Sequence, residues 1–262
     1  MMEIEPLDYI PLWLLSVFTL VLVVISIEVG YRMGKRRRRQ GSPEADSAVG
    51  SMVGAIVGLL AFLLAFTFGL AASRYDSRRQ IFLDEVNAIG TAYLRTDFLP
   101  PPHQEQTRDL LRRYVENRLA VMNYTNLQQV LHESENLHTA LWAQTAAVSN
   151  KDPRSIPIGL FISSINELID LHTKRAVTIS LQARIPVVMW AVLYGITILA
   201  MSAMGYHMGL VNRQRSLLVP VFALTFSSVI FLIADLDRPH AGTIRVSQKP
   251  MIALLNTMQE KP

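Results

Sequence analysis

The 262-residue sequence contains no cysteine. This absence excludes a disulfide framework, a zinc-thiolate site and a cysteine nucleophile, and it leaves the redox compartment open. Charged residues are also scarce, at 18% of the chain, whereas hydrophobic residues make up 50%. Ordinary soluble domains of this size carry about 25% charged residues. The composition therefore predicts a membrane protein.

The signatures of the commoner enzymes are also missing. The sequence has no glycine-rich dinucleotide or phosphate loop, no zinc-protease motif, no serine-hydrolase elbow and no EF-hand loop. His132, Glu133, Glu135 and His138 form the densest group of potential metal ligands, but His132 and His138 lie about 120° apart on a helix. Only Glu135 and His138 share a face. We expect a solvated helix surface here, with no metal, no cofactor and no enzymatic activity.

Four stretches are apolar and long enough for membrane spans, which need about 20 residues. They cover residues 10–33, 49–72, 185–210 and 217–234. A more polar region with amphipathic patterns separates the second span from the third. This layout predicts an all-α membrane protein divided at 1–72 (two spans), 73–184 (helical extramembrane domain), 185–235 (two spans) and 236–262 (a tail that packs on the domain).

No break signal follows the second span. Residues 51–98 are predicted to form one helix of about 70 Å, half of it outside the membrane. Leu99 ends it, because the three prolines that follow lack the amide donor and disfavour a helical conformation in the preceding residue. Further helices are expected over 105–124 and 127–148, from Ile158 onward and continuing into the third span, and over 251–258.

Two stripes run along the helix predicted for residues 50–79. Small residues recur at helical spacing and suit close helix packing in a membrane; they are Gly50, Gly54, Gly58, Ala61, Ala65 and Gly69. Phe62, Phe66 and Leu70 each follow a small residue by one position, so they form a bulky stripe about 100° round the helix. These three side chains could line a constriction, or they could meet lipid or a neighbouring helix.

The basic residues bear on membrane orientation. Five of them occupy residues 35–39 directly after the first span, and Arg213 and Arg215 lie in the other short loop. Basic short loops are typically cytoplasmic, which places both termini and the helical domain outside. Residues 35–39 could also bind anionic lipid, although a role as a topology anchor explains them fully. The basicity indicates no nucleic-acid partner.

Three motifs carry a family likeness. They are Tyr75, Asp76, Arg78 and Arg79; then Glu85, Asn87 and Gly90; and late in the chain Asp235, Asp237, Arg238, Pro239 and Gly242. This pattern resembles the bacterial bestrophin-like domain family, and the order of spans is similar to that of bestrophins, which are pentameric ion channels. The resemblance implies that the second span lines a pore, with Phe62, Phe66 and Leu70 as its apolar neck. Arg74, one turn further, would add a positive ring that favours anions such as chloride.

The sequence departs from bestrophins in two respects. Bestrophins bind calcium through an acidic run, of which only Asp235 and Asp237 remain here, beside Arg238. Because calcium takes six to eight oxygen ligands, we expect no calcium site. Bestrophins also keep the helical domain in the cytoplasm, opposite to the orientation that the basic loops indicate, so both orientations stay open.

Two hypotheses follow. The first is a homo-oligomeric ion channel, pentameric by resemblance, in the bacterial inner membrane, with membrane lipid and inorganic ions as its partners. The second is a non-conducting membrane scaffold or sensor whose helical domain binds a partner. An axial path along the second span would distinguish the channel from the scaffold.

Overall fold

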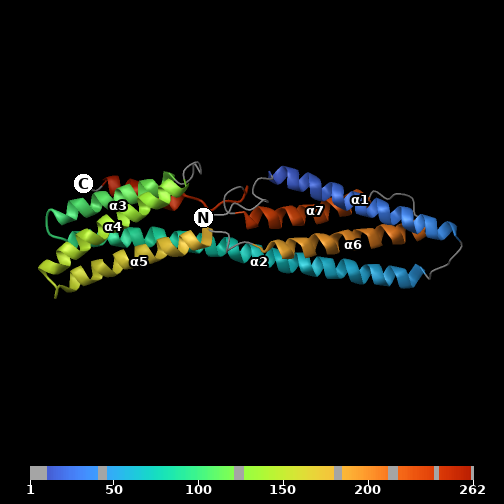
Figure 1. Ribbon diagram of the computed structural model, residues 1–262, viewed down its shortest axis with the longest axis horizontal. Coiled ribbons are helices and arrows are strands. Elements are labelled where there is room, and N and C mark those ends of the chain that lie inside the picture. Colours follow the sequence, from blue (N-terminus) through green and yellow to red (C-terminus); the bar gives the residue numbers. More distant parts are fainter. Residues whose placement is uncertain are drawn as a thin grey trace. The chain divides into compact units, whose positions relative to one another are not determined.

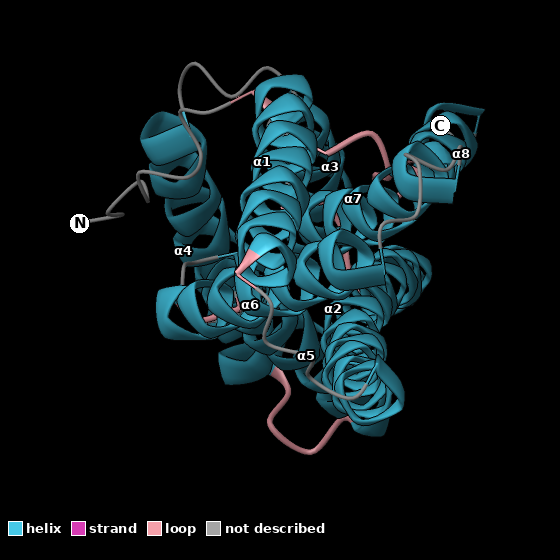
Figure 2. Cartoon of the chain, turned by 90° about the vertical axis from the view of Figure 1, so that its right-hand side faces the viewer, coloured by secondary structure: helices cyan, strands magenta, loops and turns pink. Residues whose placement is uncertain are grey.

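A computed structural model describes residues 11–40, 46–120, 127–179, 185–211, 218–238 and 242–260. Almost all of this part of the chain is helical, and the described residues contain no strand (Figures 1 and 2). The helices are α1 (Leu12–Arg39), α2 (Asp46–Arg95), η2 (Thr96–Phe98), α3 (His103–Ala120), α4 (Leu127–Lys151), α5 (Ile156–Ile179), α6 (Val187–Val211), α7 (Leu218–Asp237) and α8 (Lys249–Glu260). The all-α prediction is therefore confirmed. Arg213, Arg215 and Pro239 lie outside the described residues.

The chain forms two compact units. Unit 1 comprises Met1–Asp76 and Leu181–Arg245, and unit 2 comprises Ser77–Ser180 and Val246–Pro262. Unit 1 contains α1, the first part of α2, α6 and α7. Unit 2 contains the rest of α2, η2, α3, α4, α5 and α8. Only α2 contributes to both units.

Among the described residues, four helices are long and apolar enough to cross a membrane, namely α1, α2, α6 and α7. Many of their large apolar side chains face outward; Trp13, Phe18, Val188 and Leu199, for example, are each at least 55% exposed. In water such exposure would be costly, whereas lipid tails are as apolar as these side chains. The chain is thus a multi-pass membrane protein.

Glycines bring α1 and α6 into close contact within unit 1. A Cβ added to Gly30 would overlap the Ser202 carbonyl oxygen, and one added to Gly205 would overlap the Ile27 carbonyl oxygen. Gly34 and Gly209 repeat this arrangement one turn further along. The two glycines of each helix are four residues apart and therefore lie on one face. Because they have no side chain, the two backbones can approach closely there.

The helix predicted to continue from Ile158 into the third span is a wrong prediction. α5 ends at Ile179, α6 begins at Val187, and Ile185 and Pro186 between them are not helical. Pro186 has no amide hydrogen to donate, and it disfavours a helical Ile185. The Ile185 amide donates instead to Asp237 Oδ1 at 3.0 Å.

α2 is continuous over 50 residues, as its sequence predicts. A short 3₁₀ helix follows, and Leu99 is extended before Pro100, so the predicted stop is also confirmed. Beyond residue 76, α2 packs into unit 2, where Ile89, Leu111, Phe161 and Ile165 are fully buried.

α8 packs on α2 and α3 in unit 2. The Tyr93 hydroxyl and Arg112 Nε both donate to the Met258 carbonyl oxygen, at 3.0 and 2.9 Å. A Cβ added to Gly90 would stand 3.4 Å from the Leu254 side chain. The C-terminal helix therefore covers part of the surface of α2 that carries the second family motif.

Candidate functional site

In unit 1, α2 buries one narrow face. Leu60, Leu64, Thr67 and Ala71 are all at most 6% exposed. Leu60, Leu64 and Ala71 belong to the same hydrophobic core as buried residues of α1, α6 and α7. At 100° per residue these four positions fall within a sector of roughly 60°. Most residues on the opposite side of the apolar part of α2 are exposed.

Phe62 and Phe66 point away from that buried face. Their side chains are 66% and 56% exposed, and they lie roughly 150° round the helix from the buried sector. Leu70, the third member of the predicted neck, is partly buried. α2 is also the least covered of the four spans: 17% of its most apolar stretch is buried, against 28% to 39% in the other three.

The small-residue stripe of α2 is open. A Cβ added to Gly54, Gly58 or Gly69 would meet nothing within 4 Å, and Ala61 and Ala65 are exposed. Of the four glycines in the stripe, Gly50 alone has a close neighbour within the described chain, the imidazole of His207. This face therefore makes none of the close packing that Gly30 and Gly205 make, and its predicted role in packing between helices stays a prediction.

A shallow apolar groove adjoins the small-residue stripe. It has a volume of about 410 Å³ and lies between Ala61, Ala65 and Phe68 of α2 and Phe226 and Val229 of α7. Ala61 and Ala65 therefore belong both to the small-residue stripe and to the lining of this groove.

Arg74 lies at the end of the predicted pore stripe. Its Nη1 atom is 3.8 Å from Asp237 Oδ1, and its side chain is 29% exposed. The same Asp237 oxygen accepts the Ile185 amide. The ring of positive charge that Arg74 would form in an oligomer stays a prediction. Within the chain, the Arg74 guanidinium lies beside the Asp237 carboxylate.

Asp235 organises the segment that leaves α7. Its carboxylate accepts hydrogen bonds from the Thr243 amide at 2.6 Å, the Thr243 hydroxyl at 2.5 Å and the Ile244 amide at 3.2 Å. A Cβ on Gly242 would come within 2.7 Å of the Asp235 carbonyl oxygen. The late family motif therefore ties the chain back onto the end of α7, and this close approach explains its glycine.

The two remaining acids of the calcium motif already have protein donors. Asp235 accepts two amides and a hydroxyl, and Asp237 accepts an amide and faces Arg74. Among the described residues, no group of three or more histidine, cysteine or acidic side chains could hold a metal ion. The donor set here favours hydrogen bonding to the protein over coordination of calcium.

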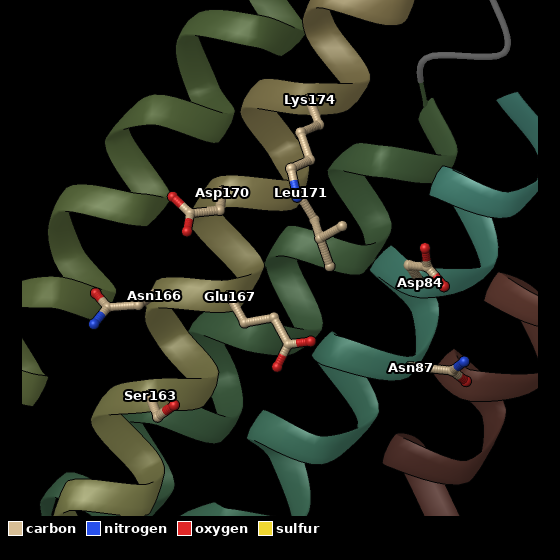
Figure 3. A pocket seen from close by; sticks show the side chains of 8 residues that line it. All are labelled: Asp84, Asn87, Ser163, Asn166, Glu167, Asp170, Leu171 and Lys174. Atoms are coloured by element: carbon tan, nitrogen blue, oxygen red, sulfur yellow. The ribbon is translucent and has the colours of Figure 1, made fainter. Parts of the chain in front are cut away.

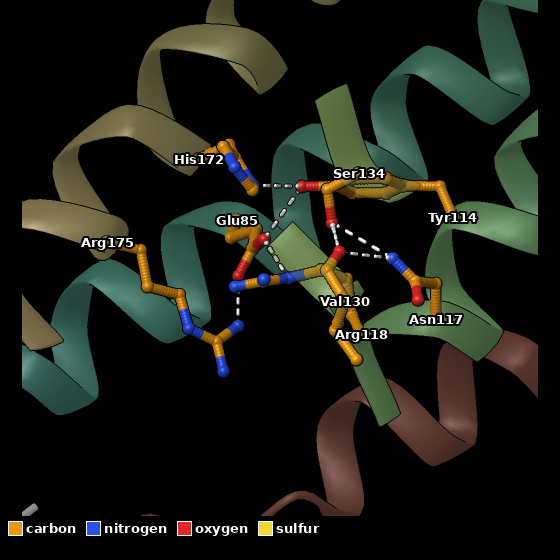
Figure 4. Close-up of polar contacts among 8 residues, drawn as sticks. All are labelled: Glu85, Tyr114, Asn117, Arg118, Val130, Ser134, His172 and Arg175. Atoms are coloured by element: carbon orange, nitrogen blue, oxygen red, sulfur yellow. Dashed lines mark hydrogen bonds and ion pairs between the residues drawn. The ribbon is translucent and has the colours of Figure 1, made fainter. Parts of the chain in front are cut away.

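Glu85 of the second family motif is the centre of a buried charged cluster in unit 2 (Figure 4). Its fully buried carboxylate pairs with Arg118 of α3, at 2.9 Å from Nε to Oε1, and with Arg175 of α5. The Tyr114 hydroxyl donates to Glu85 Oε1 at 3.0 Å and also contacts His172 Nδ1 at 3.2 Å. Two helices, α3 and α5, are thereby joined to α2.

The cluster perturbs the acidity of its members. Burial acts to raise the pKa of Glu85, but Arg118 and Arg175 outweigh this and hold the pKa below its ordinary value. Burial and the charge of Glu85 raise the pKa of Tyr114 well above its ordinary value. Glu85 is therefore ionised and Tyr114 neutral at neutral pH.

His138 and His172 complete the cluster. Their rings lie 4.6 Å apart, nearly perpendicular, and the His138 ring is 5.1 Å from that of Tyr114. Burial lowers the pKa of each histidine to about 4, together with the charges of His172 and Arg118 for His138 and the charge of Arg118 for His172. The predicted solvated surface is wrong for His138, which is 8% exposed, whereas His132 and Glu135 are exposed.

Sequence reasoning missed the partners of Glu85, although a signal was present. Glu85 lies in the apolar stripe that contains Phe82 and Ile89, and Arg118 lies in the stripe of Leu111 and Val115. A charge within an apolar stripe predicts a buried ion pair, because an unpaired buried charge is strongly unfavourable. Glu85 in one apolar stripe and Arg118 in the other therefore indicate an ion pair between the two helices.

The other motif residues divide between surface and interior. Arg78 is buried and Tyr75 is partly buried, whereas Asp76 and Arg79 are exposed. Arg238 is buried at the end of α7.

Asn87 faces a polar hollow of about 660 Å³ between α2 and α5 (Figure 3). The hollow is lined by Asp84, Asn87, Ser163, Asn166, Glu167, Asp170, Leu171 and Lys174. Three carboxylates against one ammonium make this surface of unit 2 negative.

The arrangement defines a multi-pass, all-helical membrane protein in which one span presents two uncovered faces. The family model for the bestrophin-like domain matches residues 17–251. The chain belongs to the bestrophin-like domain family. No curated protein matches the sequence.

The same fold occurs in solved structures of a bacterial bestrophin homologue from Klebsiella pneumoniae. Three of them, two with point mutations, give TM-scores of 0.63 to 0.65 at 16% to 17% identity. The similarity covers 93% to 94% of this chain and 95% to 96% of those chains. At this identity the likeness concerns the fold.

Proposed function

We propose that the protein is a homo-oligomeric ion channel whose pore is lined by α2. The observation that carries the proposal is the position of Phe62 and Phe66, which are more than half exposed and face away from the core of unit 1. α2 is also the least covered span. A central helix in a ring of subunits needs one face for the axis and other faces for its neighbours.

The open small-residue face supports the oligomer. Gly54, Gly58 and Gly69 leave backbone accessible along one side of α2, which suits close approach of a helix from another copy. This face lies about 100° from the phenylalanines, so a neighbour could pack there while Phe62 and Phe66 faced an axis. Membership of the bestrophin-like family favours a pentamer.

In such an assembly, rings of Phe62, Phe66 and Leu70 would form an apolar constriction. A narrow apolar ring excludes water and thereby blocks ions until it widens, which is gating by dewetting. Arg74 would follow at the end of the neck and favour anions such as chloride, although Asp237 lies beside it. The membrane is the bacterial inner membrane.

The test is ion flux in liposomes that contain the purified protein. Replacing Phe62→Ala and Phe66→Ala together removes two apolar rings, so we expect flux to rise by about ten-fold or more if the neck limits conduction. Leu199→Ala, at an equally exposed position on α6, is the matched control and should leave the flux unchanged. Unchanged flux in the folded, inserted double variant would exclude the neck assignment.

A second candidate is a membrane scaffold or sensor. The negative hollow of unit 2, with Asp84, Glu167 and Asp170, suits a cationic partner (Figure 3). A solubilised oligomer with no axial path along α2 would favour this function over the channel.

A further inference from the structure

The basic run after the first span is part of α1. The helix continues without a break from Leu12 to Arg39, so residues 35–39 are helical. Five consecutive residues at 100° intervals point to all sides of a helix. Lys35, Arg36, Arg37, Arg38 and Arg39 are all exposed. The run is therefore a collar of positive charge around the end of the span.

The collar lies at a defined depth. Residues 12–33 of α1 are apolar except for a few residues that include the Glu28–Arg32 pair near the end. This stretch is about 33 Å long at 1.5 Å per residue, which matches a hydrocarbon core of about 30 Å. The next residues therefore emerge among the lipid headgroups. Long arginine side chains reach several ångströms further and can meet phosphates on every side of the helix.

Packing against α6 fixes this end of α1. A Cβ on Gly209 would stand 2.8 Å from the Lys35 amide nitrogen, and one on Gly34 would overlap the Tyr206 carbonyl oxygen. The backbone at the start of the collar therefore rests directly on α6. The arginines of the collar are therefore held on a helix, within about 6 Å of one another along its axis. A flexible tail would not hold them in this way.

The nearest acid on α1 is already neutralised. Glu28 pairs with Arg32, at 2.8 Å from Oε1 to Nε, one turn before the collar. Glu28 therefore has a basic partner outside residues 35–39. Arginine guanidinium groups bind phosphate oxygens in a bidentate manner.

We propose that the collar of residues 35–39 binds the headgroups of anionic phospholipids in the bilayer. The partner is a phospholipid whose headgroup carries a net negative charge, such as phosphatidylglycerol. This inference rests on the membrane spans and is independent of whether the protein conducts ions.

The experiment measures which lipids the protein retains. Full-length protein is equilibrated in nanodiscs of roughly one part phosphatidylglycerol to four parts phosphatidylcholine, extracted, and its bound lipids are quantified by mass spectrometry. We expect phosphatidylglycerol to be enriched about three-fold or more over the bulk ratio. About 1 M salt should reduce the enrichment, because it screens exposed charges.

Variants locate the effect. Arg36→Gln, Arg37→Gln, Arg38→Gln and Arg39→Gln together should return the retained lipid to the bulk ratio. The matched control removes four exposed charges from unit 2, with Arg113→Gln, Lys151→Gln, Arg154→Gln and Lys249→Gln, and should retain the full enrichment. A second variant, with Arg36→Lys, Arg37→Lys, Arg38→Lys and Arg39→Lys, keeps the positive charge and should retain most of the phosphatidylglycerol enrichment. It provides the test if the glutamine variant does not fold.

Three outcomes would overturn the proposal. They are an absence of enrichment in the wild-type protein, equal enrichment in the folded glutamine variant, and equal loss in the unit 2 control, which would indicate net charge alone. If only the lysine variant folds, enrichment that does not respond to salt would also overturn it.

Discussion

Glu85 and Arg118 form an ion pair in the interior of unit 2, with 2.9 Å between Oε1 and Nε and side chains that are 0% and 3% exposed. Glu85 belongs to α2, whose other end carries Phe62 and Phe66, and Arg118 belongs to α3. Burying both charges costs hydration energy that only a well-placed partner offsets. The pair therefore fixes how the extramembrane part of α2 packs on the helical unit.

The charge balance of this cluster predicts an unequal effect of two substitutions. Glu85→Gln leaves Arg118 and Arg175 without a counter-charge, so we expect it to destabilise unit 2 by about 3 to 5 kcal/mol. Arg175→Met leaves Glu85 balanced by Arg118 and should cost roughly half as much. Hydrogen exchange of the α3 amides in detergent-solubilised protein measures both. A larger loss of protection for Arg175→Met would contradict the assigned charge balance.

The two buried histidines predict a dependence of stability on pH. The pKa of His138 and of His172 is about 4 in the folded protein, below the ordinary 6.5, so the unfolded chain binds these protons first. Their contribution is fully present above pH 6.5 and is lost as the pH falls towards 4. Glu85 acts in the same direction only below its ordinary pKa of 4.5. The shifts correspond to at most about 3 kcal/mol per histidine.

Thermal melting of the full-length protein at pH 7.5, 6.5 and 5.5 tests this dependence. His138→Phe is the informative variant, because it preserves a ring beside Tyr114 and His172, and the His138 Nε2 atom has no hydrogen-bond partner among the described residues. We expect the variant to lose part of the decline in melting temperature between pH 6.5 and 5.5. A slope identical to that of the wild type would show that His138 is not a proton-binding site in this range.

Two glycines of the membrane unit predict opposite kinds of defect. Gly30→Ala places a Cβ against the Ser202 backbone, so the chain itself should be destabilised by about 1 to 3 kcal/mol. Gly58→Val places a larger side chain where the chain has no neighbour within 4 Å. It should therefore leave the fold intact and weaken the oligomer, which small residues at the interface would hold together.

Melting temperature and the mass of the detergent-solubilised particle distinguish the two defects. Gly30→Ala should lower the melting temperature, and Gly58→Val should shift the particle towards smaller species at an unchanged helix content. An oligomer unaffected by Gly58→Val would mean that the small-residue face of α2 meets lipid.

The fold was largely predictable, because its signals are local. The apolar lengths of the spans, the proline stop after Leu99 and the unbroken pattern from residue 51 onward each follow from the chain's own chemistry. The break before α6 does not follow from the apolar patterns, which are present on both sides of it, although Pro186 marks it. Residues 185 and 186 are not helical, because the proline disfavours a helical conformation in the residue before it.

The site was predictable only in part. The exposure of Phe62 and Phe66 agrees with a stripe read from helical spacing, but spacing alone does not say what faces it. Contacts between distant segments were not predictable in this way. The meeting of Glu85 with Arg175, 90 residues later, depends on how α5 packs against α2. The close glycine contact of α1 with α6 depends likewise on which two spans are neighbours.

The most direct test of the pore assignment uses the absence of cysteine from the sequence. Single substitutions Phe62→Cys and Phe66→Cys introduce the only thiol in each chain, which a charged, membrane-impermeant methanethiosulfonate reagent modifies only where water reaches it. Leu199→Cys, from a position that is 67% exposed on α6, serves as the lipid-facing control. Flux through liposomes is recorded before and after the reagent is added.

We predict that the reagent changes ion flux through the Phe62→Cys and Phe66→Cys proteins and has no effect on the Leu199→Cys protein. Such a result requires that both α2 positions line a water-filled path through the membrane. Flux that is unchanged at both α2 positions, in channels shown to conduct, would contradict the central claim that α2 lines the pore.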